Sequence, residues 1–284
     1  MARARVILTT YERPQLLKLS LAAWARQTFR DFAMTIADDG SGPETAEVVR
    51  SFAATAPFPV HHSWWEHRGF RRAGVLNQGV RSGASEPMLL FTDGDCVPPA
   101  TLLAEHVAVH GPRSFAVGGA IMVDRESSAT VTEATIAAGG HERLGGFASR
   151  FKNRRRRWKS ILGVALRLRH RPKVLGANVS IDRALFDEVN GFDESFVGWG
   201  LEDSDLRDRL MAMRPRPVVR ILLGRTDTIH LWHPPSPSAG KRMNRPYYDA
   251  GGRPIRCVHG LRDERPAATR AAPGGPLLGV EHPA

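Results

Sequence analysis

The sequence predicts an α/β fold with a mostly parallel central sheet and helices on both faces. Short apolar runs alternate with longer stretches of helical periodicity through most of the chain. This alternation is typical of parallel strands joined by helical crossovers. Acidic residues directly follow two of the apolar runs, at the strand ends where an open α/β sheet binds its ligands. No glycine-rich phosphate loop follows the first run, so a bound nucleotide would be held by other means, such as a metal ion.

The first half of the chain repeats one pattern, a strand followed by a helix. An apolar run predicts a buried strand over 3–10, and Pro14 suits the first position of the helix that follows to about residue 27. The other expected elements are strands over 32–37, 59–65 and 88–92 and helices over 44–54, 71–83 and 99–110.

The second half is less regular. The expected elements are strands over 115–123, 174–181, 217–223 and 226–232, a weakly patterned stretch over 127–142, and helices over 183–189 and 202–213. The last helix is amphipathic because Leu206, Leu210 and Met213 lie at i, i+4 and i+7. From residue 234 on, nine of the 20 prolines fall within 51 residues, which predicts that the tail 234–284 is largely disordered or laid over the surface.

The net charge of +11 comes from one segment. Residues 143–181 contain twelve Lys or Arg and no Asp or Glu, whereas the rest of the 284-residue chain contains 28 basic and 29 acidic residues. The protein is therefore a balanced globule, either one large domain or one domain with an appendage, that carries a basic segment. The high net charge is no nucleic-acid signature of the whole chain, and no nucleic-acid partner is expected.

The cysteines and the apolar runs indicate the compartment. Cys96 and Cys257 are too few for a disulfide framework and lack zinc-site spacing. No run reaches the ~20 apolar residues of a membrane span, and the N-terminus leads directly into a strand, so no signal peptide is expected. We expect a cytoplasmic protein.

Asp93 and Asp95 flank Gly94 at the end of the expected strand over 88–92. Two carboxylates at one strand end repel each other unless a cation lies between them. Mg²⁺ or Mn²⁺ would suit, because these ions choose oxygen ligands and are often completed by substrate phosphates. The alternative is an acidic turn, since Asp-Gly is ordinary turn chemistry.

Asp38 and Asp39 form a second acidic pair, after the expected strand over 32–37 and at the same edge of the sheet. A carboxylate there could accept a hydrogen bond from the imide N–H of a uracil. The alternative is a helix N-cap or an Asx-turn before Pro43.

A third acidic group opens the helix over 202–213. Acids are favoured at a helix N-terminus, which alone would explain Asp205. Trp199 lies between two glycines just before this helix, however, and such a loop could approach a flat group such as a sugar ring. Asp203 or Glu202 could then act as a general base toward an acceptor hydroxyl.

The residues alone leave the roles of two further features undecided. His230 and His233 could complete a metal shell, but side chains alternate along a strand, so we expect only one to do so, with His233 the better placed. Four arginines, 154–157, precede Trp158 and a helically spaced apolar set. Residues 150–173 could contact an anionic membrane surface or a polyanion, slightly ahead of a solvated loop or a nucleic-acid arm.

Taken in order, these motifs resemble glycosyltransferase family 2 with its GT-A fold, and the second half is similar to the galactosyltransferase C-terminal region. The matching stretches, which span about residues 5–235, are 9–14, 38–41, 71–77, 92–95, 191–194 and 199–205. Each motif is weak alone, and their order is specific. The family's A-R-N is here Val75-Leu76-Asn77, with Arg71 and Arg72 upstream, and the basic insert over 143–173 matches no role in the family.

The resemblance implies separate roles for the two halves of the chain. Residues 1–233 would form the GT-A domain, with a nucleotide-binding half (1–125) and an acceptor and catalytic half (174–233). Asp93 and Asp95 correspond to the family's D-x-D, Asp95 being the more direct ligand of Mn²⁺ or Mg²⁺, and His233 to the third protein ligand. The implied substrate-binding residues are Thr9, Tyr11, Arg13, Asp39, Arg71, Asn77, Asp93, Trp199 and Gly200. Asp203 would be the catalytic base, with Glu202 as its neighbour.

The expected function is that of an inverting, metal-dependent glycosyltransferase. It would move a sugar from a nucleotide-diphosphate sugar, with UDP the expected nucleotide, to an acceptor hydroxyl in polysaccharide or glycoconjugate synthesis. It would work in the cytoplasm, with peripheral contact at the inner face of the cell membrane through 150–173. The alternatives are a degenerate transferase-like module that binds a polyanion, and a nucleotidyltransferase.

Overall fold

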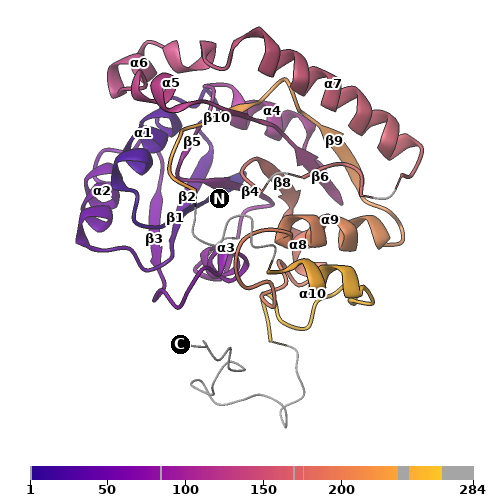
Figure 1. Cartoon of the computed structure of the whole chain (residues 1–284). Coiled ribbons are helices and arrows are strands. Elements are labelled where there is room, and N and C mark those ends of the chain that lie inside the picture. The colour runs from indigo at the N-terminus through magenta and orange to yellow at the C-terminus, as the bar shows by residue number, and fades with distance from the viewer. Residues whose placement is uncertain (1, 84, 169, 175, 236–242, 264–284) are drawn as a thin grey trace, which may run out of the picture.

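A computed structural model describes residues 2–83, 85–168, 170–174, 176–235 and 243–263 (Figure 1). The chain is an α/β fold around a seven-stranded sheet, as predicted. The strand order is β3 (Val60–Trp64), β2 (Phe32–Asp38), β1 (Ala4–Thr10), β4 (Met88–Asp93), β8 (Val179–Asp182), β6 (Ser114–Val117), β9 (Val218–Ile221). Strands β1 to β4 are parallel, β6 and β9 are parallel to each other, and β8 runs antiparallel to both β4 and β6.

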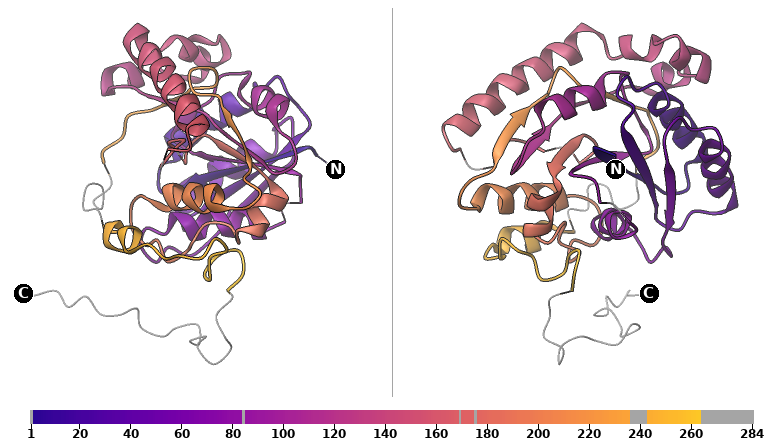
Figure 2. Two further views of the ribbon diagram at one scale, coloured as in Figure 1. Left: turned by 90° about the vertical axis from the view of Figure 1, so that its right-hand side faces the viewer. Right: turned by 180° about the vertical axis from the view of Figure 1, so that it is seen from behind.

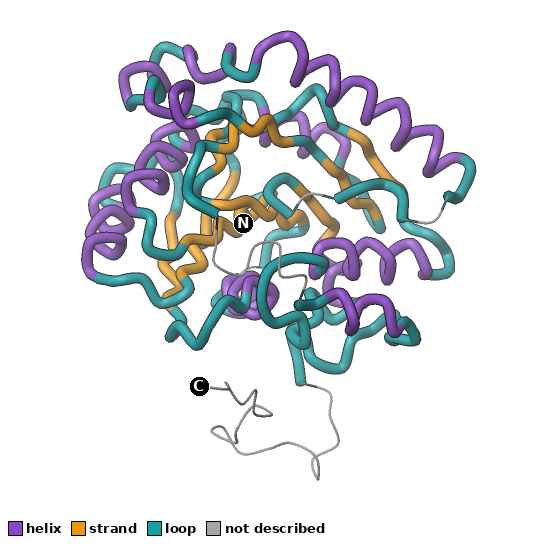
Figure 3. Tube along the Cα trace, in the orientation of Figure 1, coloured by secondary structure: helices purple, strands orange, loops and turns teal. Residues whose placement is uncertain are grey.

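Helices cover both faces of this sheet (Figure 3). On one face α1 (Pro14–Trp24), α2 (Pro43–Ala53) and α4 (Leu102–Val109) pack on residues such as Val6 and Leu90. On the other face α3 (Arg72–Arg81), α8 (Arg183–Glu188) and α9 (Glu202–Ala212) pack on Ile7 and Phe91. Successive strand residues therefore serve two different cores, as the alternation of side chains along a strand requires.

A small second sheet has the order β5 (Cys96–Val97), β10 (Thr228–His230), β7 (Ala120–Met122). It splits the predicted strand over 115–123 into β6 and β7. The break falls at two glycines with no room for a side chain: a Cβ on Gly118 would meet the Asn178 side chain at 2.3 Å, and one on Gly119 would meet Asp227 at 2.1 Å. The small sheet brings the end of β10 beside the residues that follow β4.

The stretch over 125–165 is mostly helical. Residues predicted to be weakly patterned form α5 (Arg125–Ala129), α6 (Glu133–Ala137) and a short 3₁₀ helix (Gly140–Arg143), and the basic segment forms α7 (Gly146–Ala165). Helix α7 runs along the outside of the molecule in every view (Figures 1 and 2). Among the described residues, no helix combines the length and the apolar composition needed to cross a bilayer.

Part of the C-terminal tail is laid over the domain rather than disordered, which is the second of the two predicted alternatives. Residues 243–263 carry the helix α10 (Arg245–Ala250), and the side chains of Asn244 and Cys257 are buried against the domain. The prediction for residues 236–242 and 264–284 lies outside the described residues. The proline content signalled a lack of regular secondary structure, but it did not exclude packing on the domain.

Candidate active site

The parallel register aligns the acidic residues at one edge of the sheet. Thr10 pairs with Asp38 across β1 and β2, and Thr9 pairs with Asp93 across β1 and β4. Asp39 directly follows β2, and Asp95 follows β4 after Gly94, so both lie beyond the carboxyl ends of their strands. The acidic residues predicted from the strand ends therefore lie at one edge of the sheet, the edge where ligands bind in open α/β sheets.

Arg72 joins the two halves of the cluster. Its Nη2 donates to Asp93 Oδ1 at 2.6 Å, and its Nη1 reaches Glu202 Oε1 at 3.3 Å. Thr9 Oγ1 donates to the same Asp93 oxygen at 2.8 Å. Burial would lower the pKa of the guanidinium, but the carboxylates of Asp93 and Glu202 raise it above its ordinary value. Arg72 therefore stays charged and ties the end of β4 to the start of α9.

Burial also perturbs the two acids that open α9. It raises the pKa of Glu202 to about 7, with repulsion from Asp203 adding to the effect and Arg72 opposing it. Burial raises the pKa of Asp203 as well, against the pull of Arg72 and of the Gly176 N–H, which lies 3.1 Å from Asp203 Oδ2. Glu202 Oε2 is buried and has no hydrogen-bond partner among the described residues. Such a pair can hold a proton near neutral pH, as a general base must.

Asp95 lies among cationic and imidazole groups. Its Oδ2 accepts from Arg13 Nη1 at 2.9 Å and lies 3.1 Å from His233 Nε2, while its Oδ1 lies 3.6 Å from His230 Nε2. Burial would raise the pKa of Asp95, but the hydrogen bond with His233 and the nearby charges hold it below its usual value. The hydrogen bond with Asp95 in turn raises the pKa of His233.

The expectation that only one of the two histidines faces this site is wrong. Strand β10 ends at His230, so side-chain alternation does not continue to His233, and the two rings lie 5.2 Å apart beside Asp95. Donor atoms of Asp95, Cys96 and His230 also lie within 4.8 Å of one another. Cys96 was not predicted here, and burial keeps its pKa well above the usual value, so the thiol stays protonated.

The two residues of the second acidic pair, Asp38 and Asp39, make different contacts. Asp38 is fully buried and binds His62 Nε2 at 2.9 Å and the Ser41 N–H at 2.8 Å, as in the predicted Asx-turn. Asp39 contacts His67 Nδ1 at 3.1 Å, but its Oδ1 is buried without a partner among the described residues. Burial raises the pKa of Asp39. An unsatisfied buried oxygen at a ligand-binding edge points to a donor that a ligand would supply.

Tyr11 provides a flat surface next to Asp39. Its ring stacks on the His67 ring with centroids 4.2 Å apart and planes 11° apart, and it remains partly exposed. The stack faces the same sheet edge as Asp39, because His67 binds both the side chain and the carbonyl of that residue. A planar base could extend this stack.

The tryptophan loop before α9 is held in a conformation that needs its glycines. Gly198 and Gly200 have φ of +86° and +90°, and the Trp199 side chain between them is 52% exposed. Asn244, just before α10, donates to the carbonyls of Gly198 and Gly200 at 3.3 and 2.8 Å. The exposed indole can therefore contact a ligand while the loop under it is fixed.

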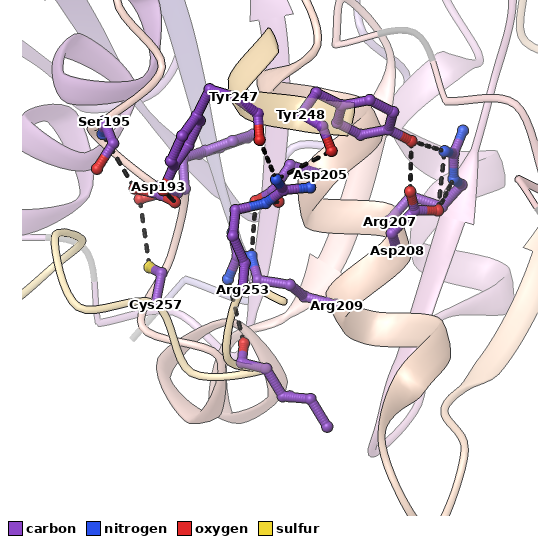
Figure 4. A network of polar contacts seen from close by, with 12 residues as sticks. Asp193, Ser195, Asp205, Arg207, Asp208, Arg209, Tyr247, Tyr248, Arg253 and Cys257 are labelled. Carbon is purple, nitrogen blue, oxygen red and sulfur yellow. Dashed lines mark hydrogen bonds and ion pairs between the residues drawn. The ribbon is translucent and has the colours of Figure 1, made fainter. Parts of the chain in front are cut away.

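Residues around α10 also brace α9 and the loop before it (Figure 4). Tyr247 Oη donates to Asp193 at 2.8 Å. Arg253 and Arg209 each donate to Asp205 at 2.7 Å, so the buried Asp205 carboxylate is shared by two guanidinium groups. The acidic start of α9 thus rests on a part of the chain that the sequence predicted to be disordered or laid over the surface.

Two predicted substrate-binding residues do not join the contacts of Arg72: Arg71 acts on Asp39, and Asn77 lies inside the domain. The Arg71 guanidinium carbon lies 4.2 Å from the centroid of the Trp65 ring, and Arg71 donates to the Glu66 carbonyl. Arg71 directly precedes Arg72 in the chain, but the two side chains have different partners. Asn77 is fully buried, and its amide exchanges hydrogen bonds of 2.8 and 3.0 Å with the Phe192 backbone. Asn77 therefore fixes the loop before α9 rather than lining the sheet edge. Arg72 was missed because helical periodicity could not choose between two adjacent arginines at a helix start.

Comparison with known proteins agrees with this geometry. The family model described as glycosyl transferase family 2 matches residues 5–175, and the one described as the N-terminal domain of galactosyltransferase matches residues 165–229. Validoxylamine A glucosyltransferase of Streptomyces hygroscopicus subsp. jinggangensis is 32% identical over 217 residues, covering 73% of this chain and 51% of the relative. Chondroitin synthase of Escherichia coli is 26% identical over 219 residues, covering 72% of this chain and 32% of the relative. The chain spans about half or less of these relatives.

Solved structures share the fold at low sequence identity. The mannosyltransferase PcManGT from Pyrobaculum calidifontis has a TM-score of 0.57 at 18% identity, covering 89% of this chain and 65% of its own. TarS of S. aureus residues 1–349 with UDP-GlcNAc has a TM-score of 0.56 at 15% identity, covering 84% and 61%. The first family model covers more than half of the chain, and the sheet has the order and register described above. The chain belongs to glycosyl transferase family 2, a family of glycosyltransferase enzymes with the GT-A fold.

Proposed function

We propose that this chain transfers a sugar from a nucleotide-diphosphate sugar to an acceptor hydroxyl, with inversion at the anomeric carbon. The observation that carries the proposal is the link from Asp93 through Arg72 to Glu202. It joins the sheet edge, which would hold the donor, to the start of α9, which would hold the acceptor and the base. A transferase needs these two subsites side by side, because reacting groups must be brought within contact of each other.

UDP is the nucleotide that we propose for the donor. The buried, unpartnered Oδ1 of Asp39 would accept the imide N–H of uracil, and the exposed face of the Tyr11–His67 stack would lie against the base. Thr9 would line the same subsite. The solved neighbours include TarS with UDP-GlcNAc and PcManGT with GDP-Man and Mn²⁺. The choice of UDP rests on the carboxylate rather than on these neighbours.

The donor atoms around Asp95 fit a divalent cation. Asp95 and His233 would hold it, with His230 within reach and Asp93 at the other side of Gly94. A carboxylate with imidazoles favours Mn²⁺, whereas Mg²⁺ prefers oxygen ligands alone. Bound there, the ion would neutralise the charge that develops on the departing diphosphate. Arg13, which contacts Asp95, is a further positive group for the same diphosphate.

Asp203 is our proposed base, with Glu202 as its neighbour. Asp203 accepts the proton of the acceptor hydroxyl while that oxygen attacks the anomeric carbon from the face opposite the diphosphate. One bond, from carbon to diphosphate oxygen, breaks as the new glycosidic bond forms, so a single displacement inverts the centre. The raised pKa values of both acids suit a group that must take up a proton near neutral pH. The exposed ring of Trp199 would stack on the acceptor sugar.

We place the reaction in polysaccharide or glycoconjugate synthesis. The relatives named above are a validoxylamine A glucosyltransferase and a chondroitin synthase, which supports a carbohydrate-containing acceptor. We also propose that residues 150–173 contact an anionic surface or a polyanion. Their charge supports this, since the segment is basic throughout and has no acidic residue. Charge alone does not distinguish a membrane from a soluble polyanion.

Incubation with a panel of nucleotide sugars and Mn²⁺ tests the reaction type. Release of free UDP, lost in Asp203→Asn and weakened in Asp39→Ala, supports the proposal. Release of pyrophosphate instead would indicate a nucleotidyltransferase. Absence of either product with every donor and acceptor, in a chain that still binds polyanions, would indicate a degenerate binding module.

A further inference from the structure

Helix α7 presents its small and polar residues to the protein. Asn153, Ser160 and Gly163 are its buried residues. Asn153 donates to Asp227 at 2.8 Å and to the Ala120 carbonyl at 3.3 Å, which fixes the rotation of the helix. A Cβ on Gly163 would meet the Arg171 side chain at 2.7 Å, so a larger residue does not fit on this side. The usual amphipathic arrangement, with the apolar side facing inward, is therefore reversed.

The large apolar residues of this segment point away from the protein. They are Phe147, Phe151, Trp158, Ile161, Leu162 and Leu166, all exposed. Phe147 is 83% exposed and Trp158 is 69% exposed. Consecutive helical residues are about 100° apart, so Trp158 points to the side opposite the buried Ser160. Spacings of four and seven residues align the others in one stripe, which we call the outer stripe.

Basic residues border the outer stripe on both sides. From 146 to 168 the chain has eight Lys or Arg and no Asp or Glu; the basic residues are Arg150, Lys152, Arg154, Arg155, Arg156, Arg157, Lys159 and Arg167. Within the described ranges none of them forms an ion pair, and Arg150 donates to the backbone carbonyls of Glu142 and Leu144. The positive charge of the segment is thus left for an external partner.

We propose that α7 lies flat in the headgroup region of an anionic membrane, with the outer stripe inserted among the acyl chains. The inference names the partner of the basic segment and does not depend on the transfer reaction. Twenty residues give a helix about 30 Å long, and one that is aromatic on one side and basic on both flanks matches interfacial helices. The lipid headgroups would neutralise the arginines while the acyl chains cover the rings.

Two other occupants fit the surface less well. A second copy of this chain would cover the outer stripe, but it would bring two uncompensated basic segments together. A soluble polyanion would match the charge, but it would leave the six apolar side chains in water. An anionic bilayer satisfies both features, and α7 need not span it.

Flotation of the full chain with vesicles tests the proposal. We expect binding to vesicles of phosphatidylcholine with phosphatidylglycerol and little binding to phosphatidylcholine alone. Replacing Phe151 and Trp158 with Ser should weaken binding at least about tenfold, whereas Val258→Ser, at an exposed apolar residue far along the chain, should not. Arg155→Glu with Arg156→Glu should cause a similar loss, and the matched pair Arg30→Glu with Arg50→Glu should not.

A fluorescent label reports insertion directly. Cys96 and Cys257 are both buried, so Trp158→Cys can be labelled selectively with an environment-sensitive dye. We expect a blue shift of its emission on anionic vesicles and no shift for Ala54→Cys at the end of α2. No shift at position 158, or heparin binding without flotation, would overturn the proposal in favour of a soluble polyanion. A chain that dimerises through this face would overturn it in favour of self-association. Activity on a soluble acceptor should be unchanged in all these variants, so failure here is separable from failure of the proposed reaction.

Discussion

The guanidinium of Arg72 lies 2.6 Å from Asp93 Oδ1, and this contact is the centre of the candidate active site. Only 13% of the Arg72 side chain is exposed, and its other terminal nitrogen reaches Glu202 at 3.3 Å. The end of β4 and the start of α9 are more than a hundred residues apart in sequence, and the arginine brings them into one electrostatic unit. A change in charge on either acid will therefore be felt by the other.

Replacement of Arg72 should separate the two halves of the site. Arg72→Gln leaves Asp93 and Glu202 without their common partner, so we expect a loss of about 3 kcal/mol in the free energy of unfolding. Transfer should fall at least about a hundredfold. Arg72→Lys keeps the charge but cannot bond both acids, so it should recover stability more than activity. Urea unfolding and steady-state rates measure the two effects.

The neighbouring arginine is the matched control for this test. Among the described residues Arg71 stacks over Trp65 and forms no ion pair with Asp93 or Glu202, and its charge lowers the pKa of Asp39 instead. Arg71→Gln should therefore keep more of the activity than Arg72→Gln. An Arg71→Gln variant as inactive as Arg72→Gln would contradict the distinction between the two arginines.

Glu202 should destabilise the fold at alkaline pH. Its folded-state pKa of about 7 lies above that of an exposed glutamate, so the protonated form favours folding. The stability that protonated Glu202 contributes is fully present below the unfolded-state pKa, near 4.5, and is lost as the pH rises through about 7. At about pH 8 the free energy of unfolding of Glu202→Gln should therefore exceed that of the wild type by roughly 2 kcal/mol. At about pH 5 the two free energies of unfolding should be nearly equal.

Glu86 offers a control of opposite sign. Burial would raise its pKa, but the hydrogen bond and charge of Arg5 hold the pKa of this carboxyl below its usual value. Glu86→Gln should thus lower stability at about pH 8, and the difference should shrink as the pH falls through the folded-state pKa. A Glu202→Gln chain that is less stable than the wild type at about pH 8 would contradict the burial argument.

The sequence predicted the sheet and its acidic edge because both follow from local patterns. Apolar runs mark strands, and a residue that follows a parallel strand must lie at the carboxyl edge, so Asp39, Asp93 and Asp95 could be placed together. The resemblance to a family added the order of the motifs. These signals were sufficient for the fold class and for the position of the candidate site.

Other features depend on contacts that no local pattern encodes. Whether Arg71 or Arg72 faces the acids depends on the rotation of α3, and one residue changes that direction by about 100°. His230 and His233 both reach Asp95 because β10 ends earlier than its apolar run suggested. The reversed orientation of α7 is set by Asn153 and Asp227, which are far apart in the chain. Periodicity showed that α7 is amphipathic, but not which side faces the protein.

The α10 segment should control the acceptor side. Tyr247→Phe removes the hydrogen bond to Asp193 and should lower stability by about 1 kcal/mol, or roughly 2–4 °C in melting temperature. It should also raise KM for the acceptor more than for the donor, because Asp193 lies on the loop that leads to Trp199. Melting curves and kinetics with each substrate varied measure these effects.

Tyr248 is the comparison for Tyr247. It bonds Asp208 and Arg207 within α9 and not Asp193 on the loop. Tyr248→Phe should lower stability by a similar amount and leave KM for the acceptor near the wild-type value. Equal changes in KM for both variants would mean that the effect of Tyr247 is only structural.

Calorimetric titration of a UDP-sugar, with and without Mn²⁺, tests the central claim most directly. The claim is that the sheet edge is a donor site at which Asp95 helps to hold a divalent cation against the diphosphate, while Asp203 acts only on the acceptor. The account predicts that Mn²⁺ strengthens binding to the wild type and to Asp203→Asn alike, and that Asp95→Ala loses this gain. Binding that is indifferent to Mn²⁺ in the wild type, or an Asp95→Ala variant that responds to Mn²⁺ like the wild type, would contradict it.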